Sequence, residues 1–224
     1  MLVTNAIKRR LGRGGLKALK LLRAELRISR RHRKSAKRAA AYRIATDLKL
    51  NIGCGDNLKS GWVNIDLLSP RADLALDMRE PLPFADNSVA IVYSEHFFEH
   101  LDYPGDAQRF LKECHRVFKA GGIFSVAVPD TQWPLEAYVG PDDKGYFRLA
   151  KAEWHPAWCK TRLAQINYHF RQDGEHRFAY DYETLKHVLS EAGFTNIELR
   201  SFDVDLDTES RKIGTLYVSA RPQK

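Results

Sequence analysis

Short apolar runs alternate with helical segments from Leu48 to the end of the chain, and this alternation constrains the fold more than any other feature. Strands that alternate with helices are typical of an open, largely parallel α/β sheet with helices on both faces. The strands are predicted at 48–52, 62–66, 72–76, 89–93, 123–128, 196–202 and 215–220, and the helices at 107–118 and 182–192. The pair Gly121-Gly122 stops the first of these helices, and Gly193 closes the second.

The composition indicates one globular domain. A chain of 224 residues, 44% of them hydrophobic, can bury a sizeable core. The sequence contains neither an apolar run long enough for a membrane span nor the pattern of a secretory signal, so we expect a cytoplasmic protein. The three cysteines are widely spaced without a CxxC pair, which indicates reduced thiols rather than disulfides or a cysteine zinc site.

The positive charge of the protein lies in its N-terminal part. Residues 1–47 carry a net charge of +13, and the remainder carries −5. The tripeptide KRR at 8–10 and a flexible stretch at 12–15 precede a helix predicted over 16–44. Its apolar positions recur at helical spacing among basic residues: Leu16, Leu19, Leu22 and Leu26. The sequence therefore predicts a basic amphipathic arm, residues 1–47, before a domain at 48–224.

The turn after the first strand has the features of a nucleoside-binding site. In an open α/β sheet the ligand binds at the carboxyl ends of the strands, where the first turn must let it approach the backbone. Gly53 and Gly55 fall at this turn, and Asp66 ends the second strand, where a carboxylate can accept both ribose hydroxyls. A dinucleotide needs a third glycine at the position of Leu58 so that a helix N-terminus can reach the pyrophosphate. The turn therefore favours a cofactor without phosphates over NAD.

Six segments, taken in order, resemble the class I S-adenosylmethionine (SAM)-dependent methyltransferases. They are LNIGCG at 50–55, VNID at 63–66, DM at 77–78, LPFADNSV at 82–89, EHL at 99–101 and LKECHRVFKAGG at 111–122. The similarity covers about residues 48–220 and is greatest to small methyltransferases of surface-glycan and lipid biosynthesis. It implies SAM as the cofactor and a seven-stranded, mostly parallel Rossmann-like sheet whose last strand, 215–220, runs antiparallel.

The resemblance also implies which residues contact the cofactor. Gly53 and Gly55 would contact the methionine end of SAM, and Asp66 would contact its ribose. Asp77 and Met78 would contact the adenine, and Ser94 and Glu95 would line the far side of the cofactor. Asn57 stands where the family often has a third glycine, so the outer part of the turn is built differently. No cofactor contact is assigned to Asp56 or Asn57.

The end of the fourth strand bears on the acceptor and on metal binding. The run SEHF at 94–97 lacks the prolines typical of enzymes that methylate nucleobase amines, which disfavours base methylation. The run HFFEH at 96–100 spells H-x-x-E-H, but its place among the methyltransferase motifs argues against a zinc protease. Quinone-biosynthesis O-methyltransferases look similar here and hold a divalent cation, so His96, Glu99 and His100 are an alternative metal site. The preferred prediction is a capped helix with internal hydrogen bonds and no metal.

An aromatic-rich segment, residues 131–182, is predicted to form an insertion or lid. It holds eleven of the 24 aromatic residues, among them Trp133, Trp154 and Trp158. Aromatic faces with a few polar groups suit a sugar ring or an isoprenoid-like acceptor, although the same rings can simply pack a small subdomain. His176 and His169 are the predicted catalytic bases, because a neutral imidazole can take a hydroxyl proton near pH 7. A structural role for either histidine is the alternative.

The sequence thus predicts a SAM-dependent methyltransferase that methylates an oxygen of a glycan, lipid-linked or other small hydroxyl acceptor. In this hypothesis the arm lies on an anionic membrane surface, at the inner face of the membrane. Two other functions stay open. The protein is alternatively an RNA-modifying methyltransferase whose arm binds phosphates, or a non-catalytic methyltransferase-like subunit that binds a partner through the arm.

Overall fold

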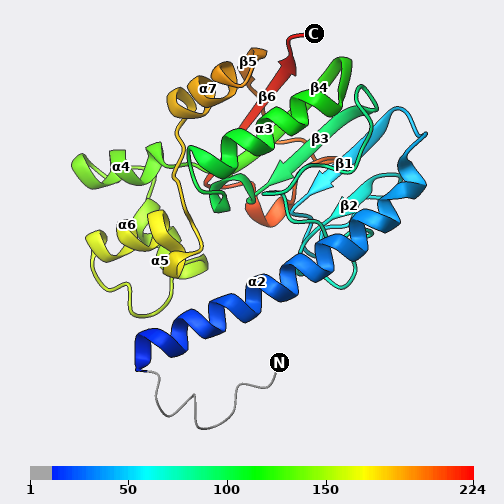
Figure 1. Cartoon of the computed structure of the whole chain (residues 1–224). Helices are drawn as coiled ribbons and strands as arrows, with labels where there is room; N and C mark the ends of the chain where they lie inside the picture. The colour runs from blue at the N-terminus through cyan, green and yellow to red at the C-terminus, as the bar shows by residue number, and fades with distance from the viewer. Residues whose placement is uncertain (1–11) are drawn as a thin grey trace.

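The computed structural model describes residues 12–224, whose strands form one six-stranded sheet in the order β2-β1-β3-β4-β6-β5. The strands are β1 (Leu48–Ile52), β2 (Val63–Ile65), β3 (Val89–Glu95), β4 (Phe118–Pro129), β5 (Phe194–Leu199) and β6 (Thr215–Pro222). Strands β1 to β4 pair in parallel, whereas β6 lies antiparallel between β4 and β5 (Figure 1). The predicted α/β sheet and its antiparallel last strand are confirmed.

The segment 72–76, predicted as a strand, is where the sheet differs from the prediction. It meets β2 through one isolated bridge between Ile65 and Leu74. The Asp73 carboxylate, rather than a backbone carbonyl, accepts the Asn64 N–H at 2.8 Å. Because a side chain replaces the backbone partner, the ladder does not extend, and residues 12–224 form six strands rather than seven.

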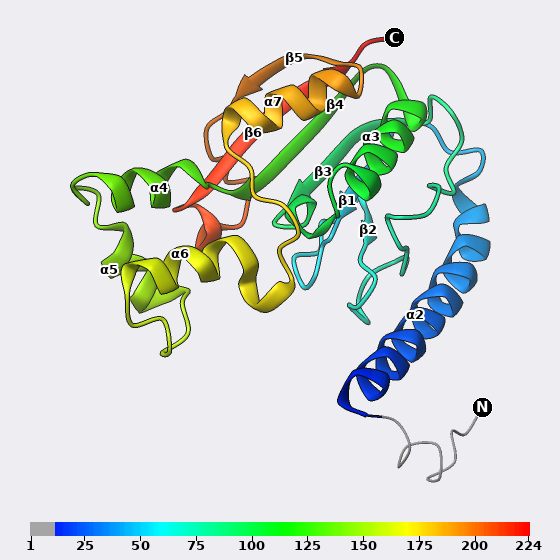
Figure 2. The same ribbon diagram turned by 60° about the vertical axis from the view of Figure 1, so that its left-hand side comes forward.

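The three helices predicted at 16–44, 107–118 and 182–192 are present, and the structure adds further helices between and after them. In chain order, the helices are α2 (Arg13–Arg38), η1 (Ala39–Tyr42), η2 (Phe98–His100), α3 (Gly105–Val117), α4 (Gln132–Val139), α5 (Tyr146–Glu153), α6 (Arg162–Arg171), η3 (Gln172–Gly174), α7 (Tyr182–Glu191) and η4 (Glu209–Arg211). Helices α3 and α7 lie over the same face of the sheet (Figures 1 and 2). The apolar positions of α3 are spaced to form one stripe, which is buried, and Phe110 meets Phe124 of β4 edge to face at 6.4 Å.

Helices α4, α5 and α6 form a small helical subdomain at one end of the sheet (Figure 2). Its own apolar core contains Ala137, Tyr146, Phe147, Ala150 and Ile166, with Trp133 and Phe170 packed against it. Part of the aromatic content of the 131–182 segment therefore stabilises this subdomain. The remaining rings are free to line a binding site.

Helix α2 begins at Arg13, so the predicted flexible stretch at 12–15 is helical after Gly12. The basic tripeptide at 8–10 lies outside the described residues. The C-terminal half of α2 is docked on the sheet domain: the Ser35 hydroxyl accepts the Ala75 N–H at 2.8 Å. Ser35 is buried, and Ala39, in the turn that follows α2, is fully buried in the main core. This part of the predicted arm therefore packs as part of the domain, ahead of the predicted boundary at residue 47.

The turn after β1 offers a matched pair of glycine substitutions. Gly53 and Gly55 both have a positive φ, at +68° and +50°, which strains any residue with a Cβ by about 1–2 kcal/mol. A Cβ on Gly53 would lie 2.5 Å from the Cβ of Phe97, whereas a Cβ on Gly55 meets nothing within 4 Å. We therefore expect Gly53→Ala to lower the free energy of unfolding clearly more than Gly55→Ala, as measured by urea denaturation. Equal losses would show that Phe97 yields without cost.

Candidate active site

The residues predicted to bind ligands lie at the carboxyl edge of the parallel strands. Gly53 follows β1, Asp66 follows β2, and Ser94 and Glu95 end β3. Ser94 lies beside Ile52 in the sheet register, directly next to the glycine turn. Parallel strands end on the same side of a sheet, so residues distant in the sequence meet here.

Asp66 holds the glycine turn in place. One carboxylate oxygen, Oδ2, accepts a hydrogen bond from the N–H of Gly55 at 3.0 Å. The other, Oδ1, accepts hydrogen bonds from the N–H groups of Leu68 at 2.7 Å and Ser69 at 2.6 Å. A carboxylate offers about four acceptor positions, so these bonds occupy most of them. In this structure the predicted ribose ligand is therefore also the residue that ties together two turns at the edge of the sheet.

Asp77 and Met78, predicted to face the adenine, are both buried. Arg79 donates its backbone N–H and its guanidinium to the Asp77 carboxylate. Burial alone would raise the pKa of Asp77, but the hydrogen bonds from Arg79 lower it overall. Arg79 also forms an ion pair with Glu25 of α2 at 2.9 Å. A groove of about 750 Å³ is lined by residues of α2 on one side and by residues 77–81 on the other.

Ser94 and Glu95, predicted on the far side of the cofactor, have different environments. Ser94 is fully buried, and its hydroxyl has no hydrogen-bond partner within residues 12–224. The Glu95 carboxylate accepts the backbone N–H of Thr208 at 3.0 Å and its hydroxyl at 2.6 Å, and pairs with Arg211 at 3.4 Å. Glu95 thus anchors the connection between β5 and β6 over the edge of the sheet.

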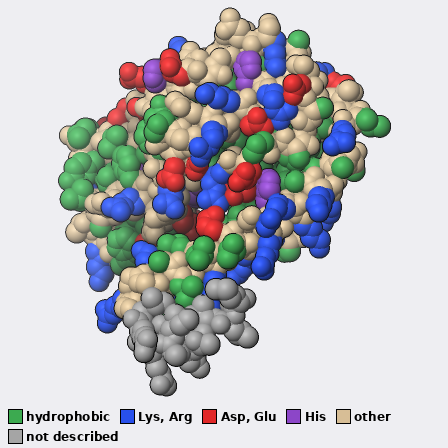
Figure 3. All heavy atoms as spheres, in the orientation of Figure 1, with side chains coloured by type: hydrophobic (Ala, Val, Ile, Leu, Met, Phe, Trp, Pro, Cys, Tyr) green, Lys and Arg blue, Asp and Glu red, His purple; other side chains and the backbone are tan. Residues whose placement is uncertain are grey.

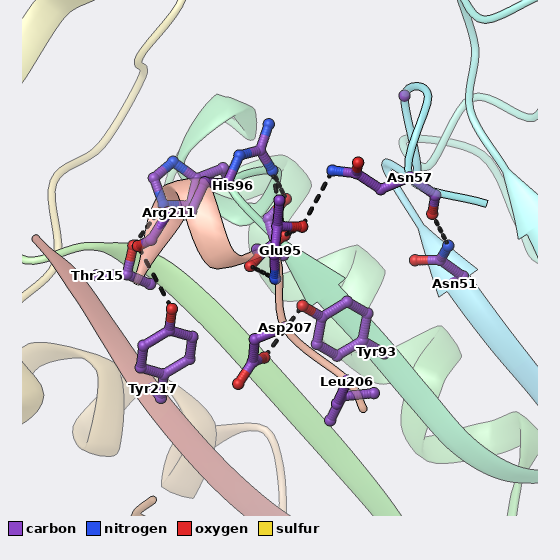
Figure 4. A network of polar contacts seen from close by, with 12 residues as sticks. Asn51, Asn57, Tyr93, Glu95, His96, Leu206, Asp207, Arg211, Thr215 and Tyr217 are labelled. Carbon is purple, nitrogen blue, oxygen red and sulfur yellow. Dashed lines mark hydrogen bonds and ion pairs between the residues drawn. The ribbon is translucent and has the colours of Figure 1, made fainter. Parts of the chain in front are cut away.

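This connection also contacts the glycine turn, as the polar network in Figure 4 shows. The Asn57 side chain donates to the Thr208 hydroxyl at 3.1 Å, and the Tyr93 hydroxyl donates to Asp207 at 3.1 Å. The space around Gly55 is open, and the Ser94 hydroxyl lacks a partner among the described residues. A buried unpaired hydroxyl is costly, so an open backbone turn beside it fits the polar methionine end of SAM.

A cavity of about 330 Å³ lies at the other side of β3, where β3 and β4 end and β6 begins. Its walls consist of aromatic rings, imidazoles and a few charged groups, among them His96, Asp130, Tyr146, Trp154, His155, Tyr168, His169, His176 and Arg211. Both predicted bases, His169 and His176, line this cavity. The aromatic segment and the strand ends therefore contribute to one site.

Two of the imidazoles are held in the neutral form. Burial lowers the pKa of His96 to about 3 and that of His169 to about 4. Nε2 of His96 lies 2.8 Å from the Thr215 hydroxyl. Nδ1 of His169 lies 3.2 Å from the Tyr146 hydroxyl, and its Nε2 is buried without a hydrogen-bond partner in the described part of the chain.

Glu99 has a different environment from the one predicted. It is only 2% exposed, and neither carboxylate oxygen has a hydrogen-bond partner among residues 12–224. The predicted internal hydrogen bonds are therefore absent for Glu99, whereas His96 and His100 do make internal hydrogen bonds. Burial raises its pKa to about 8. Its Oε1 lies 3.8 Å from Nε2 of His100 and 4.0 Å from Nε2 of His176. His96, bonded to Thr215, is not part of this group.

Two charged residues of the cavity were not predicted from the sequence. Asp130 directly follows β4, the same strand-end position that identified Asp66, so this signal could have found it. Burial raises the pKa of Asp130. Arg211 comes from a connection without a motif, and only the fold places it against Glu95 and the cavity.

Residues 50–126 match the family described as "Methyltransferase domain". Malonyl-[acyl-carrier protein] O-methyltransferase 1 of Coxiella burnetii is 48% identical over 52 residues, which cover 22% of this chain and 17% of that protein. Demethylmenaquinone methyltransferase of Staphylococcus saprophyticus is 29% identical over 121 residues, 54% of this chain and 48% of that protein. The chain thus spans less than half the length of these curated relatives.

Solved structures agree on the fold. A possible exported protein from Bordetella parapertussis superposes with a TM-score of 0.50 at 16% identity, over 87% of this chain and 68% of that one. The predicted methyltransferase domain that uses SAM is therefore confirmed for residues 50–126, which match the methyltransferase family model and align with curated methyltransferases.

Proposed function

We propose that this protein transfers the methyl group of SAM to a hydroxyl group of a small, glycan or lipid-linked acceptor. The observation that carries the proposal is the position of the histidine-lined cavity, which lies across β3 from the glycine turn at the same edge of the sheet. SAM, when bound, supplies an activated methyl group that the acceptor oxygen takes by in-line displacement. The protein contributes proximity, orientation and a base.

On the cofactor side, we assign the backbone at Gly53 and Gly55 and the hydroxyl of Ser94 to the methionine end. Asp66 takes the ribose, and Asp77 with Met78 takes the adenine. Glu95 acts indirectly, because its carboxylate is occupied by Thr208 and Arg211. It positions the connection that separates the cofactor site from the acceptor cavity.

The cavity suits a compact acceptor. Its volume of about 330 Å³ is at the lower end of the range for small-molecule sites, about 300–1,000 Å³. Trp154 and Tyr168 offer ring faces to a sugar or a lipid head group, and polar groups at the strand ends can orient it. One relative is named an O-methyltransferase, which agrees with an oxygen acceptor.

Of the two predicted bases, we assign proton transfer to His169. With Nδ1–H donating to the Tyr146 hydroxyl, Nε2 carries a lone pair that has no partner among the described residues. An acceptor hydroxyl that reaches this nitrogen would satisfy it and could pass its proton to it. His176 donates its Nδ1–H to the carbonyl oxygen of His169 at 2.8 Å, so it positions the base.

The N-terminal half of α2 supports the proposed contact with an anionic membrane surface. Leu21, Leu22 and Leu26 are 58%, 57% and 50% exposed among lysines and arginines, and hydrophobic and basic side chains lie side by side along α2 (Figure 3). Leu16 and Leu19 of the predicted stripe are half-buried. No helix within residues 12–224 is long and apolar enough to cross a membrane, so we propose a peripheral contact.

Replacing Asp66 by Asn should weaken SAM binding by about 1.5–3 kcal/mol, because a charge-assisted contact and the link to Gly55 are both weakened. Calorimetric titration with SAM measures this. Asp56→Asn is the matched control, since the Asp56 carboxylate is 81% exposed and forms no more than a long ion pair of 3.8 Å with Arg71. Equal affinity of the two variants would remove Asp66 from the cofactor site.

Replacing His169 by Gln should slow methyl transfer by about 10²-fold or more and leave SAM affinity nearly unchanged, as expected for a general base. Because the pKa of His169 is lowered to about 4, its basic form persists in acid, so the wild-type rate should not fall with a midpoint near the ordinary histidine value of about 6.5. Transfer of labelled methyl groups to a panel of sugars and lipid-linked sugars measures both.

The control for this variant is His187→Ala, on the exposed face of α7. A wild-type rate for His169→Gln would place the base elsewhere. A tested panel without any labelled product, together with tight SAM binding, would favour the non-catalytic alternative.

Replacing Leu21, Leu22 and Leu26 together by Ser should remove the salt-resistant part of binding to vesicles that contain phosphatidylglycerol. The basic residues contribute about 1 kcal/mol each to membrane binding at low salt. When salt screens these charges, only leucine side chains inserted into the lipid keep the protein on the membrane. Vesicle sedimentation at rising salt measures this. The control replaces three exposed apolar residues outside the arm: Val139, Leu163 and Leu199. Tight, steeply salt-dependent RNA binding without vesicle binding would favour the RNA-modifying alternative.

A further inference from the structure

We propose that Glu99, His100 and His176 bind a divalent transition-metal ion, with Zn²⁺ as the preferred class, at the wall of the acceptor cavity. Each of the three residues offers one ligand atom, and these atoms all lie within 4.8 Å of one another. The group joins the turn after β3 to the segment that follows α6. The inference does not depend on which acceptor the cavity takes.

The first argument is the state of the Glu99 carboxylate. It is 2% exposed, and neither oxygen has a hydrogen-bond partner within the described chain. Asp66, Asp77 and Glu95 at the same edge are all satisfied by N–H or O–H donors. A carboxylate buried without donors is strongly disfavoured in its ionised form, so it either keeps a proton or pairs with a cation. A bound cation would therefore supply the positively charged partner that Glu99 lacks among the described residues.

The second argument is the orientation of the two imidazoles. Nδ1 of His100 lies 3.0 Å from the carbonyl oxygen of Glu175, and Nδ1 of His176 lies 2.8 Å from that of His169. A carbonyl oxygen only accepts, so each Nδ1 carries the hydrogen. In a neutral ring, Nε2 then carries the lone pair, and both Nε2 atoms face Oε1 of Glu99 at 3.8 and 4.0 Å. Three electron-rich atoms therefore converge.

These distances are close to those of a metal site. Ligands at about 2.0–2.2 Å from a tetrahedral Zn²⁺ lie about 3.4 Å from one another, so a small contraction would complete the site. Histidines that bind metals usually donate their other ring N–H to a carbonyl or carboxylate, as both do here. Two imidazoles with one carboxylate favour Zn²⁺ or Fe²⁺ over Mg²⁺ and Ca²⁺, which prefer oxygen ligands.

The site differs from the metal set considered from the sequence, because His176 takes the place of His96. His176 also lines the acceptor cavity. Three protein ligands leave a coordination position for water or for an oxygen of the acceptor, and a cation there would help to orient that oxygen and lower its pKa. An imidazolium–carboxylate ion pair without metal is the competing explanation of the same geometry.

The test uses the full chain without a polyhistidine tag, stripped with a chelator and titrated with Co²⁺ and then Zn²⁺. We expect one Co²⁺ per chain, a visible absorption band typical of nitrogen and oxygen ligation, displacement by Zn²⁺, and a higher melting temperature with either ion. Glu99→Gln, His100→Ala and His176→Ala should each weaken binding by at least about 10²-fold, as expected when a ligand rather than a supporting residue is lost. His187→Ala and Glu191→Gln, both exposed on α7, should bind as the wild type does.

Absence of stoichiometric binding in the wild type would overturn the proposal and leave the ion pair. Undiminished metal binding by Glu99→Gln and His100→Ala would also overturn the proposal, because the ions would then bind elsewhere on the surface. A loss of metal binding in His187→Ala as large as in the ligand variants would overturn it for the same reason. If the buried Glu99 variant does not fold by circular dichroism, His100→Ala decides, since the His100 side chain is 33% exposed and tolerates truncation more easily.

Discussion

The parallel pairing of β3 with β1 on one side and with β4 on the other is the constraint on which both sites depend. Parallel strands end at the same edge, and each end releases the chain into a turn whose polar groups are not used by the sheet. The β1 and β2 ends give the glycine turn and Asp66, and the β3 and β4 ends give Glu95, His96 and Asp130. The proposed cofactor site and the proposed acceptor cavity are neighbours for this reason, with β3 between them.

The same edge also concentrates polar atoms without partners. Within the described residues, the Ser94 hydroxyl, the Glu99 carboxylate and Nε2 of His169 are buried and make no hydrogen bond. Each unmade bond costs about 1–3 kcal/mol, more for a charge, and a folded chain tolerates such costs mainly where a ligand removes them. The three groups therefore correspond to three proposed partners: the methionine end of SAM, the metal ion and the acceptor hydroxyl.

Helix α2 forms most of the basic arm and reaches the proposed cofactor side of the domain. Its C-terminal half is docked, and Nδ1 of His32 accepts the N–H of Asp77 at 3.1 Å, next to the predicted adenine position. Its N-terminal half exposes leucines and basic residues instead. One helix would thus join the proposed membrane contact at one end to the proposed cofactor site at the other.

The sequence by itself pointed to a methyltransferase domain and to SAM through its resemblance to known motifs. Its short-range patterns, which are apolar periodicity, glycines at a turn and acids at strand ends, predicted six of the strands and the residues of the glycine turn. It also identified His169 and His176 within the aromatic segment. Only the tertiary structure decided how these residues are used. Asp66 and Glu95 bind turns and connections, His96 turns to Thr215, and His176 meets Glu99 and His100. Such contacts join residues far apart in the chain, so no local pattern records them. They form when the sheet brings its strand ends together and the helical subdomain closes over them.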